Sequence, residues 1–270
     1  MAFHSFPLFL VLVCATAQIV QTKELNVLFI GNSYTYVNDV PHLIEKLAQA
    51  SGLTLKHDQH TEGGWTLEKH WNSQTTISKI HQGNWDVVVI QEYSTRTSEK
   101  PQDICQISFP YAKKLAEEVH QYNPNAKIQW YLTWGRPFGD SDRCNEIPQV
   151  CTFGGMQNAI TETYTTYGCM FKAGQVAPVG EGFREYKKMF GDEAYSALYR
   201  TNDHHASLQG SYLSACVHFS TLFGQPCLGN TYGSSLDAGI VEGLQIAADL
   251  AVDKADWTYP ADSDCKLSMC

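Results

Sequence analysis

The stretch from Leu25 to Thr35, LNVLFIGNSYT, constrains the fold more than any other part of this chain. Its first six residues are apolar apart from Asn26, and Gly31 then breaks the run. A short apolar run that ends at a glycine is typical of a strand buried on both faces of a parallel sheet. Ser33 is therefore expected at the carboxyl edge of such a sheet, where open α/β folds bind their ligands.

Ser33 has two interpretations. It is a nucleophile if a helix follows, because the free N–H groups at the start of that helix would stabilise negative charge on a substrate oxygen. It is a turn residue or a helix N-cap if the stretch is purely structural, since Gly, Asn and Ser are common in both places. Short motifs of this kind often occur by chance, so this stretch alone favours the structural interpretation.

Strand-like and helix-like segments alternate along the rest of the chain. The run DVVVI at 86–90 is the plainest strand, and apolar residues at helical spacing mark 41–51. This alternation predicts an α/β fold, with a parallel, doubly wound sheet and helices on both faces. Strands are expected at 25–30, 53–56, 86–90, 128–133 and 175–178, and helices at 41–51, 66–81, 111–122, 155–171, 182–189, 208–222 and 238–252.

The first residues have the features of a secretory signal peptide. Phe6 to Ala15 is an apolar run of suitable length, and Ala15-Thr16-Ala17 supplies the small residues of a cleavage site. We therefore expect residues 1–17 to be removed and the protein to be secreted. No other stretch approaches the roughly 20 apolar residues of a membrane span, so no membrane partner is expected. Residues 25–255 are expected to form one domain, because no linker divides them, and 256–270 a cysteine-containing tail.

Charge and cysteine content limit the expected partners further. The formal net charge is −9 and basic residues do not cluster, so nucleic acid is not an expected partner.

Eight of the nine cysteines follow residue 17, and an even number in a secreted chain implies disulfides, so we expect most to be paired and no free thiol. Cys144 and Cys151 are the easiest local pair, while Cys265 and Cys270 could close the tail or tie it to the body. Their spacing matches no zinc site.

Polar residues follow the strand at 86–90, at the sheet edge where Ser33 is expected. The Gln91 amide could donate to an oxyanion or be a satisfied loop amide. Glu92 could be a helix cap or a surface charge. The pair Gly63-Gly64 could bring a backbone N–H close to a ligand or form a plain tight turn.

A second informative stretch, Asn202 to His205, lies immediately before an amphipathic helix. A catalytic His needs a partner to fix its tautomer and stabilise its imidazolium, and a carboxylate two or three residues earlier can supply it. Alternatively, the stretch is a polar loop in which Ser207 caps the helix. A Ser after the first strand combined with a late Asp/His turn favours a catalytic pair.

Six motifs together resemble the SGNH (GDSL-type) hydrolases: LFIGNSYT, EGGWTL, WDVVVIQE, YLTW, APVGEGF and HHASLQGSYLSAC. They are closer still to a subgroup of that superfamily known only as a domain of unknown function. The resemblance runs from about Leu25 to Phe223. It implies a three-layer α/β/α sandwich with a five-stranded parallel sheet, and hydrolysis of acyl or acetyl esters of carbohydrates or lipids. It implies no metal and no cofactor.

The resemblance also assigns roles to single residues. Ser33 matches the nucleophile and its N–H the first oxyanion donor, Gly64 matches the second donor, and His205 matches the general base. Gln91 stands where the family usually has an Asn as third donor.

The position of the acid departs from the family pattern. The family places a carboxylate three residues before the His, where this chain has Asn202, and Asp203 follows one residue later. A neutral amide cannot stabilise an imidazolium as a carboxylate does. We expect Asp203 to orient His205 if the turn is rearranged, whereas Asn202 would do so if the family geometry is kept. The sequence thus predicts a secreted serine esterase acting on a small-molecule or glycan ester. The alternative is a catalytically impaired protein of the same fold that binds extracellular carbohydrate or matrix.

Overall fold

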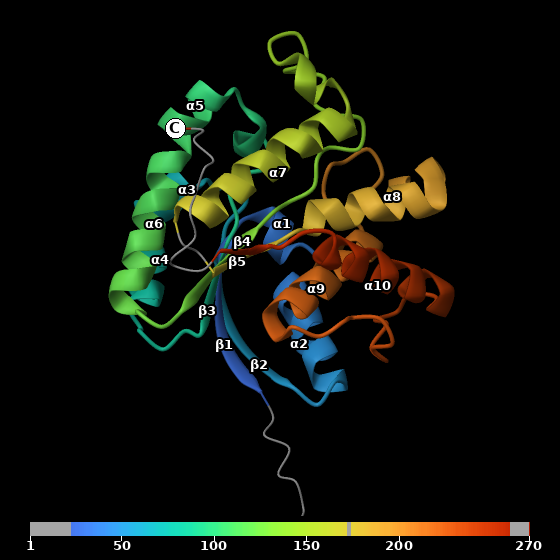
Figure 1. Ribbon diagram of the computed structural model, residues 1–270, viewed down its shortest axis with the longest axis horizontal. Helices are drawn as coiled ribbons and strands as arrows, with labels where there is room; N and C mark the ends of the chain where they lie inside the picture. The colour runs from blue at the N-terminus through green and yellow to red at the C-terminus, as the bar shows by residue number, and fades with distance from the viewer. Residues whose placement is uncertain (1–22, 172–173, 260–269) are drawn as a thin grey trace, which may run out of the picture.

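The computed structural model describes residues 23–171, 174–259 and 270, so the predicted signal peptide at 1–17 and Cys265 lie outside the described residues. A six-stranded sheet with the order β2-β1-β3-β4-β5-β6 forms the middle of the molecule (Figure 1). The first five strands are parallel, which confirms the predicted sheet, and β6 is antiparallel. The strands are β1 (Glu24–Gly31), β2 (Thr54–Thr61), β3 (Val87–Ile90), β4 (Lys127–Tyr131), β5 (Gly174–Ala177) and β6 (Thr258–Tyr259).

The β1 strand shows why an unbroken apolar run marks a central strand. Its side chains alternate between two buried clusters: Val27 and Phe29 join one, and Leu28 and Ile30 join the other. Successive side chains of a strand point to opposite faces, so a strand covered by helices on both sides is apolar at every position.

Helices cover both faces of the sheet and complete three layers (Figure 1). One face carries α2 (Val40–Ala50), α8 (Val179–Ser196), α9 (Leu208–Phe223) and α10 (Ala238–Asp253). The other carries α3 (Leu67–Trp71), α4 (Gln74–Ile80), α5 (Pro101–Ile107), α6 (Phe109–Tyr122) and α7 (Phe153–Met170). The short helix α1 (Ser33–Tyr36) follows β1 directly. In the part of the chain that the structure describes, no helix combines the length and apolar character needed to cross a membrane.

One predicted helix needs correction, and one strand of the sheet is not predicted from the sequence. The single helix expected at 66–81 is divided into α3 and α4, because the Ser73 side chain accepts a hydrogen bond from the Thr76 N–H and starts a new helix. The sheet has a sixth strand that the sequence did not predict, in which Thr258 and Tyr259 pair with β5. Two residues are too few to show any periodicity.

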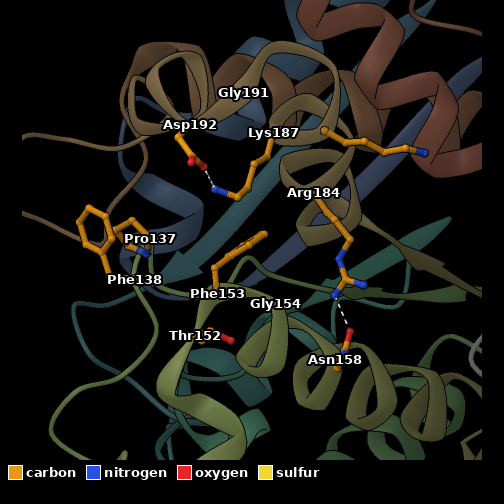
Figure 2. Close-up of a pocket in the computed structure, with 11 residues that line it drawn as sticks. Pro137, Phe138, Thr152, Phe153, Gly154, Asn158, Arg184, Lys187, Gly191 and Asp192 are labelled. Atoms are coloured by element: carbon orange, nitrogen blue, oxygen red, sulfur yellow. Dashed lines mark hydrogen bonds and ion pairs between the residues drawn. The ribbon is translucent and has the colours of Figure 1, made fainter.

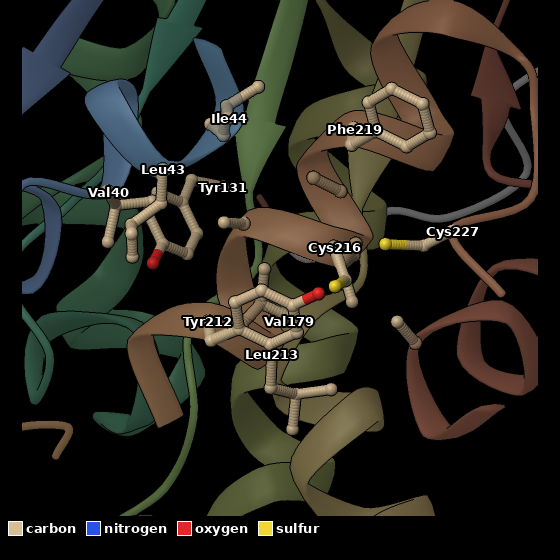
Figure 3. Close-up of a cluster of buried hydrophobic side chains, with 14 of the residues drawn as sticks. Val40, Leu43, Ile44, Tyr131, Val179, Tyr212, Leu213, Cys216, Phe219 and Cys227 are labelled. Carbon is tan, nitrogen blue, oxygen red and sulfur yellow. The ribbon is translucent and has the colours of Figure 1, made fainter. Parts of the chain in front are cut away.

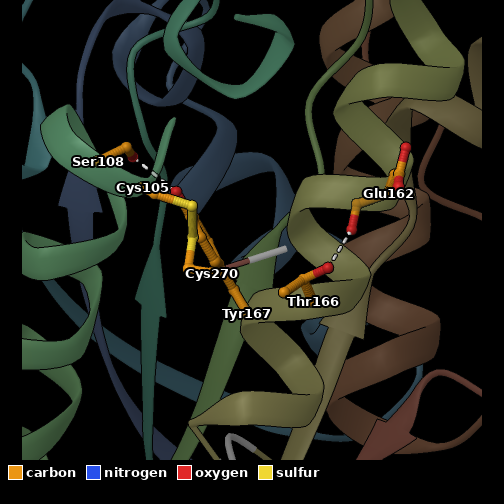
Figure 4. The surroundings of a disulfide bond; sticks show 6 residues. All are labelled: Cys105, Ser108, Glu162, Thr166, Tyr167 and Cys270. Carbon is orange, nitrogen blue, oxygen red and sulfur yellow. Dashed lines mark hydrogen bonds between the residues drawn. A yellow bond between two sulfur atoms is a disulfide. The ribbon is translucent and has the colours of Figure 1, made fainter. Parts of the chain in front are cut away.

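Two disulfides are present among the described residues. Cys144 pairs with Cys151, as their spacing predicted. Cys105 of α5 pairs with Cys270, so the last residue of the chain is tied to the body (Figure 4).

The remaining described cysteines differ in state. Cys169 is disulfide-bonded. Cys216 and Cys227 are buried thiols, and their sulfur atoms are turned toward each other in the cluster beside α9 (Figure 3). The expectation of no free thiol is therefore wrong for this pair, although most of the described cysteines are paired.

Candidate active site

In the turn after β1, the Ser33 hydroxyl is not used to cap the helix that follows. Asn32, not Ser33, caps α1: its side-chain oxygen accepts a hydrogen bond from the Tyr34 N–H at 3.1 Å. The Asn32 amide nitrogen donates to the Trp65 carbonyl at 2.9 Å, which ties the glycine loop to the same turn. Ser33 is the first residue of the helix and is partly exposed.

The structure brings Ser33, His205 and Asp203 into one hydrogen-bonded chain. The Ser33 Oγ lies 2.8 Å from His205 Nε2. His205 Nδ1 lies 2.8 Å from one carboxylate oxygen of Asp203 and 3.0 Å from the other. With a proton on Nδ1, the ring donates to the carboxylate, and Nε2 is free to accept from the serine hydroxyl.

Asp203, rather than Asn202, reaches the histidine. Asn202 has a positive φ of 56°, is exposed, and makes no hydrogen bond to His205 in the described part of the chain. The Asp203 carboxylate also accepts the N–H groups of His204 at 2.6 Å and His205 at 3.2 Å. Burial would raise the pKa of Asp203, but the hydrogen bonds from the His205 ring and these N–H groups outweigh it and lower that pKa. The carboxylate is therefore ionised at neutral pH.

Two backbone N–H groups, those of Ser33 and Gly64, have no hydrogen-bond acceptor among the described residues. The Ser33 N–H opens α1, where the helix offers it no acceptor. The Gly64 N–H likewise has no acceptor among the described residues. Gly64 has a φ of 68°, a conformation that favours glycine. Its loop stays close to α1, since a Cβ on Gly63 would lie 3.1 Å from the Tyr36 hydroxyl.

Gln91 lies beneath the turn that carries Ser33 and is buried away from solvent. Its side chain is fully buried, and its oxygen accepts from the Asn32 N–H at 2.9 Å and the Thr35 hydroxyl at 3.0 Å. Its nitrogen donates to the Glu92 carbonyl at 2.6 Å. The expectation that Gln91 donates to the oxyanion is therefore wrong in this geometry, and Gln91 instead positions the turn. A Cβ on Gly31 would lie only 2.6 Å from the Gln91 oxygen, so the contact requires glycine there.

Glu92 acts as a helix cap, one of its two predicted roles. The buried carboxylate accepts from the Leu67 N–H at the start of α3, at 3.1 Å, from the Tyr93 N–H at 2.6 Å and from the Ser108 hydroxyl at 2.5 Å. Burial raises the pKa of Glu92, and these hydrogen bonds only partly offset that effect. Glu92 thereby fixes the end of the loop that carries Gly64.

Sequence reasoning missed a second support, His70. Its Nε2 lies 2.9 Å from the Gly31 carbonyl, and its Nδ1 lies 3.0 Å from the Thr76 hydroxyl. Burial lowers the pKa of His70 to about 4, so the ring is neutral and donates from Nε2. The signal that could have found it is a histidine three residues after Leu67, on the apolar side of the helix that follows the glycine loop.

A stack of aromatic rings fixes the turn that carries His205. Tyr34 stacks on Trp134 at 4.2 Å between ring centroids, and Trp134 stacks on Phe183 at 4.8 Å. The His205 ring meets Tyr34 edge-on at 5.7 Å, and the Trp134 indole N–H donates to the His204 carbonyl at 3.0 Å. These contacts therefore restrict the movement of the His205 imidazole.

Asp203, His204 and His205 also have the spacing of a possible cation site. Their ligand atoms lie within 4.8 Å of one another, the one such group within 23–171 and 174–259. A cation there would compete for the hydrogen bonds that Asp203 accepts from the His205 ring. The arrangement therefore suits proton transfer between Ser33 and His205 better than metal binding.

Comparison with known proteins identifies the fold. No family model and no curated protein matches the sequence. Among solved structures, a DUF4886 family protein from Bacteroides uniformis ATCC 8492 matches with a TM-score of 0.73 and 17% identity, over 88% of this chain and 98% of that one. An acetyl xylan esterase, AlAXEase, matches with a TM-score of 0.53 and 16% identity, over 73% of this chain and 99% of that one.

A third structure, a Parabacteroides merdae ATCC 43184 protein provisionally described as a GDSL-like lipase, matches with a TM-score of 0.51 and 14% identity. The alignment covers 75% of this chain and 97% of that one. At these identities the matches show the fold alone. The chain has an SGNH hydrolase-like fold, which confirms the resemblance seen in its motifs.

Proposed function

We propose that this protein is a secreted serine esterase that hydrolyses acyl or acetyl esters of a small molecule or glycan. The observation that carries the proposal is the hydrogen-bonded chain from Ser33 Oγ through His205 to Asp203. Nucleophile, base and orienting acid stand in the order that ester hydrolysis needs. The apolar run at 6–15 and the disulfides support secretion.

Acylation begins when the Ser33 hydroxyl attacks the ester carbonyl and His205 Nε2 takes its proton. The tetrahedral oxyanion is held by the N–H groups of Ser33 and Gly64. The Asp203 carboxylate stabilises the imidazolium. The intermediate collapses as His205 gives its proton to the leaving alcohol, which leaves an acyl group on Ser33.

Deacylation repeats these steps with water. His205 takes a proton from the water, whose oxygen attacks the acyl carbonyl, and returns that proton to Ser33 as the carboxylic acid leaves. No further group is required for the atoms and charges to balance.

Covalent labelling tests the proposal. A fluorophosphonate probe should label the wild-type protein and the Ser78→Ala variant, which changes an exposed serine of α4. It should not label Ser33→Ala. The labelled wild type should also lose its hydrolysis of a short-chain aryl ester. A folded wild type that neither takes up the probe nor hydrolyses the ester would instead favour the binding protein of the same fold.

A further inference from the structure

The candidate catalytic pair is assembled from two turns that lie far apart in the chain. Ser33 follows β1 and His205 precedes α9, 172 positions later, yet Ser33 Oγ lies 2.8 Å from His205 Nε2. The two atoms must stay close to this separation, because a misplacement of about 1 Å can lower a rate about 100-fold. Some part of the fold must therefore set the distance between the two turns.

Trp134 contacts both turns, one through its rings and the other through its N–H. Its indole stacks on Tyr34, the residue after Ser33, at 4.2 Å between centroids and with 6° between the ring planes. The indole N–H donates to the carbonyl of His204, the residue before His205, at 3.0 Å. One rigid side chain therefore contacts the neighbour of the nucleophile and the neighbour of the base.

The backbone on both sides of Trp134 is bound by one buried side chain of α7. The Gln157 amide oxygen accepts from the Gly135 N–H at 2.8 Å, and the Gln157 amide nitrogen donates to the Thr133 carbonyl at 3.1 Å. Gln157 is itself fully buried. These two hydrogen bonds hold Trp134 in place without help from either turn.

The Trp134 ring also has little room to move. It stacks on Phe183 of α8 at 4.8 Å, with 9° between the ring planes, and its side chain is only 1% exposed. Because close packing keeps buried side chains in place, an indole with two such neighbours can act as a spacer of fixed size.

A second buried tryptophan lacks these contacts. Trp130 of β4 is fully buried, but its indole nitrogen has no hydrogen-bond partner in the described part of the chain. Trp130 belongs to the other core cluster, where it packs against Tyr167 and Phe171. A substitution at Trp130 therefore removes a buried indole without removing a contact to Tyr34 or His204.

The segment that carries Trp134 also offers an exposed ring for comparison. It continues to Pro137 and Phe138, which line a pocket of about 730 Å³ together with Phe153 of α7 (Figure 2). The Phe138 side chain is 84% exposed, so its removal changes the surface of this segment and leaves the buried stack intact.

We propose that Trp134 is a positioning residue that holds the turns of Ser33 and His205 at reacting distance. The stack places Tyr34 and with it Ser33, and the indole N–H places His204 and with it His205. Trp134 acts through these neighbours, and its burial keeps it from contact with a substrate. The inference rests on the proposed esterase function and adds to it a residue that affects kcat and not KM.

Kinetics of four variants test the proposal. Trp134→Phe keeps a ring for the stack but removes the N–H, so kcat for 4-nitrophenyl acetate should fall at least about tenfold, with KM within about twofold of wild type. Trp134→Leu removes the stack as well and should lower kcat further. Trp130→Phe and Phe138→Ala should keep kcat within about twofold of wild type.

Melting temperatures separate positioning from stability alone. Trp134→Phe and Trp130→Phe both remove part of a buried ring, so both should melt at a lower temperature than wild type. A role in stability alone predicts that kcat is unchanged in both folded variants. That result would overturn the proposal, and so would an equal fall of kcat in both.

A measurement without turnover separates this inference from the esterase proposal. The proton that His205 Nδ1 donates to Asp203 should give a far-downfield ¹H NMR signal in wild type that is missing in Asp203→Asn. The signal should persist in Trp130→Phe and broaden or disappear in Trp134→Phe, because the turn is no longer held. An unchanged signal in Trp134→Phe would overturn the positioning role. A Trp134-dependent signal with no ester hydrolysis by wild type would overturn the esterase and leave the positioning of His205.

Discussion

At the scale of single residues, the Asp203 carboxylate has two separable tasks. One oxygen accepts the backbone N–H groups of His204 and His205 and shapes the turn, while both oxygens face His205 Nδ1. An asparagine in this place could keep one accepting oxygen and so keep the turn, but it would bring no charge to the imidazolium.

We therefore predict that Asp203→Asn lowers kcat for a short-chain aryl ester about 100-fold or more, with little change in melting temperature, because charge is lost and the turn is kept. Asn202→Asp is the matched control, since Asn202 makes no hydrogen bond to His205 in the described part of the chain, and it should change kcat little. A rise in activity in Asn202→Asp would show that the family geometry holds in solution.

A variant of Gln91 can test whether this side chain positions the turn or donates to the oxyanion. Gln91→Ala leaves the buried Asn32 N–H and Thr35 hydroxyl without their acceptor, so the free energy of unfolding should fall by about 1–3 kcal/mol. Labelling by the fluorophosphonate should slow as the turn loosens. Urea denaturation checks the first effect. Loss of activity with unchanged stability would contradict this assignment and return Gln91 to the oxyanion site.

The positions of the candidate catalytic residues can be predicted from the sequence better than those of the side chains that hold them in place. Ser33 follows a strand and His205 precedes a helix, and such edge positions follow from local patterns. The orientation of Gln91 does not, because it depends on the register of β1 beside β3, where Ile30 pairs with Ile90 and Gly31 comes to lie over the amide. A strand's register is set by contacts distant in sequence.

At the scale of elements, two buried histidines join helices to the sheet. His70 of α3 bonds the carbonyl of Gly31 at the end of β1, and His218 of α9 lies 2.6 Å from the Gln129 amide of β4. Burial lowers the pKa of His70 to about 4 and that of His218 to about 3. Both rings are therefore neutral in the folded protein at pH 7.

The lowered pKa values of the two buried histidines predict that the protein loses stability in mild acid. The folded pKa values of His70 and His218 lie below the unfolded value of about 6.5, so the unfolded chain takes up protons first as pH falls. The stabilisation is complete above pH 6.5, and each histidine should lose about 2 kcal/mol of it between pH 6.5 and 5.

Urea denaturation at both pH values measures the effect. His218→Gln should reduce the pH dependence by about half, since one of the two histidines no longer titrates. His42→Gln, which changes an exposed histidine of α2, should leave it unchanged. A free energy of unfolding that is flat from pH 6.5 to 5 would contradict the neutral buried rings.

Element types follow from the sequence more readily than element ends. The apolar run of β3 and the amphipathic pattern of α2 are local and strong, and both elements lie where they are expected. The α9 helix also lies where a helix is expected, but it is buried on nearly every side and is not amphipathic. The break between α3 and α4 depends on a single cap at Ser73, and β6 depends on pairing with a strand about 80 residues away. Caps and distant pairing leave little trace in a periodic pattern.

At the scale of the whole molecule, the three-layer fold could be predicted because alternating strands and helices allow few other architectures. The way in which the chain end is tied down could not. Eight cysteines allow about 105 pairings, and only the short Cys144–Cys151 loop stands out by spacing. The bond between Cys105 of α5 and Cys270 joins residues 165 positions apart, and no local pattern predicts that they meet.

The two disulfides should stabilise the protein unequally. Cys105 and Cys270 are 165 residues apart, whereas Cys144 and Cys151 are 7 apart. A crosslink removes more entropy from the unfolded chain when it closes a longer loop, which gives about 5 kcal/mol for the first and about 2.5 kcal/mol for the second. The double variant Cys105→Ala with Cys270→Ala should therefore lower the free energy of unfolding more than Cys144→Ala with Cys151→Ala. Urea denaturation of both under non-reducing conditions measures the order, and a larger loss from removing the short loop would show that strain or structure in the unfolded chain outweighs loop entropy.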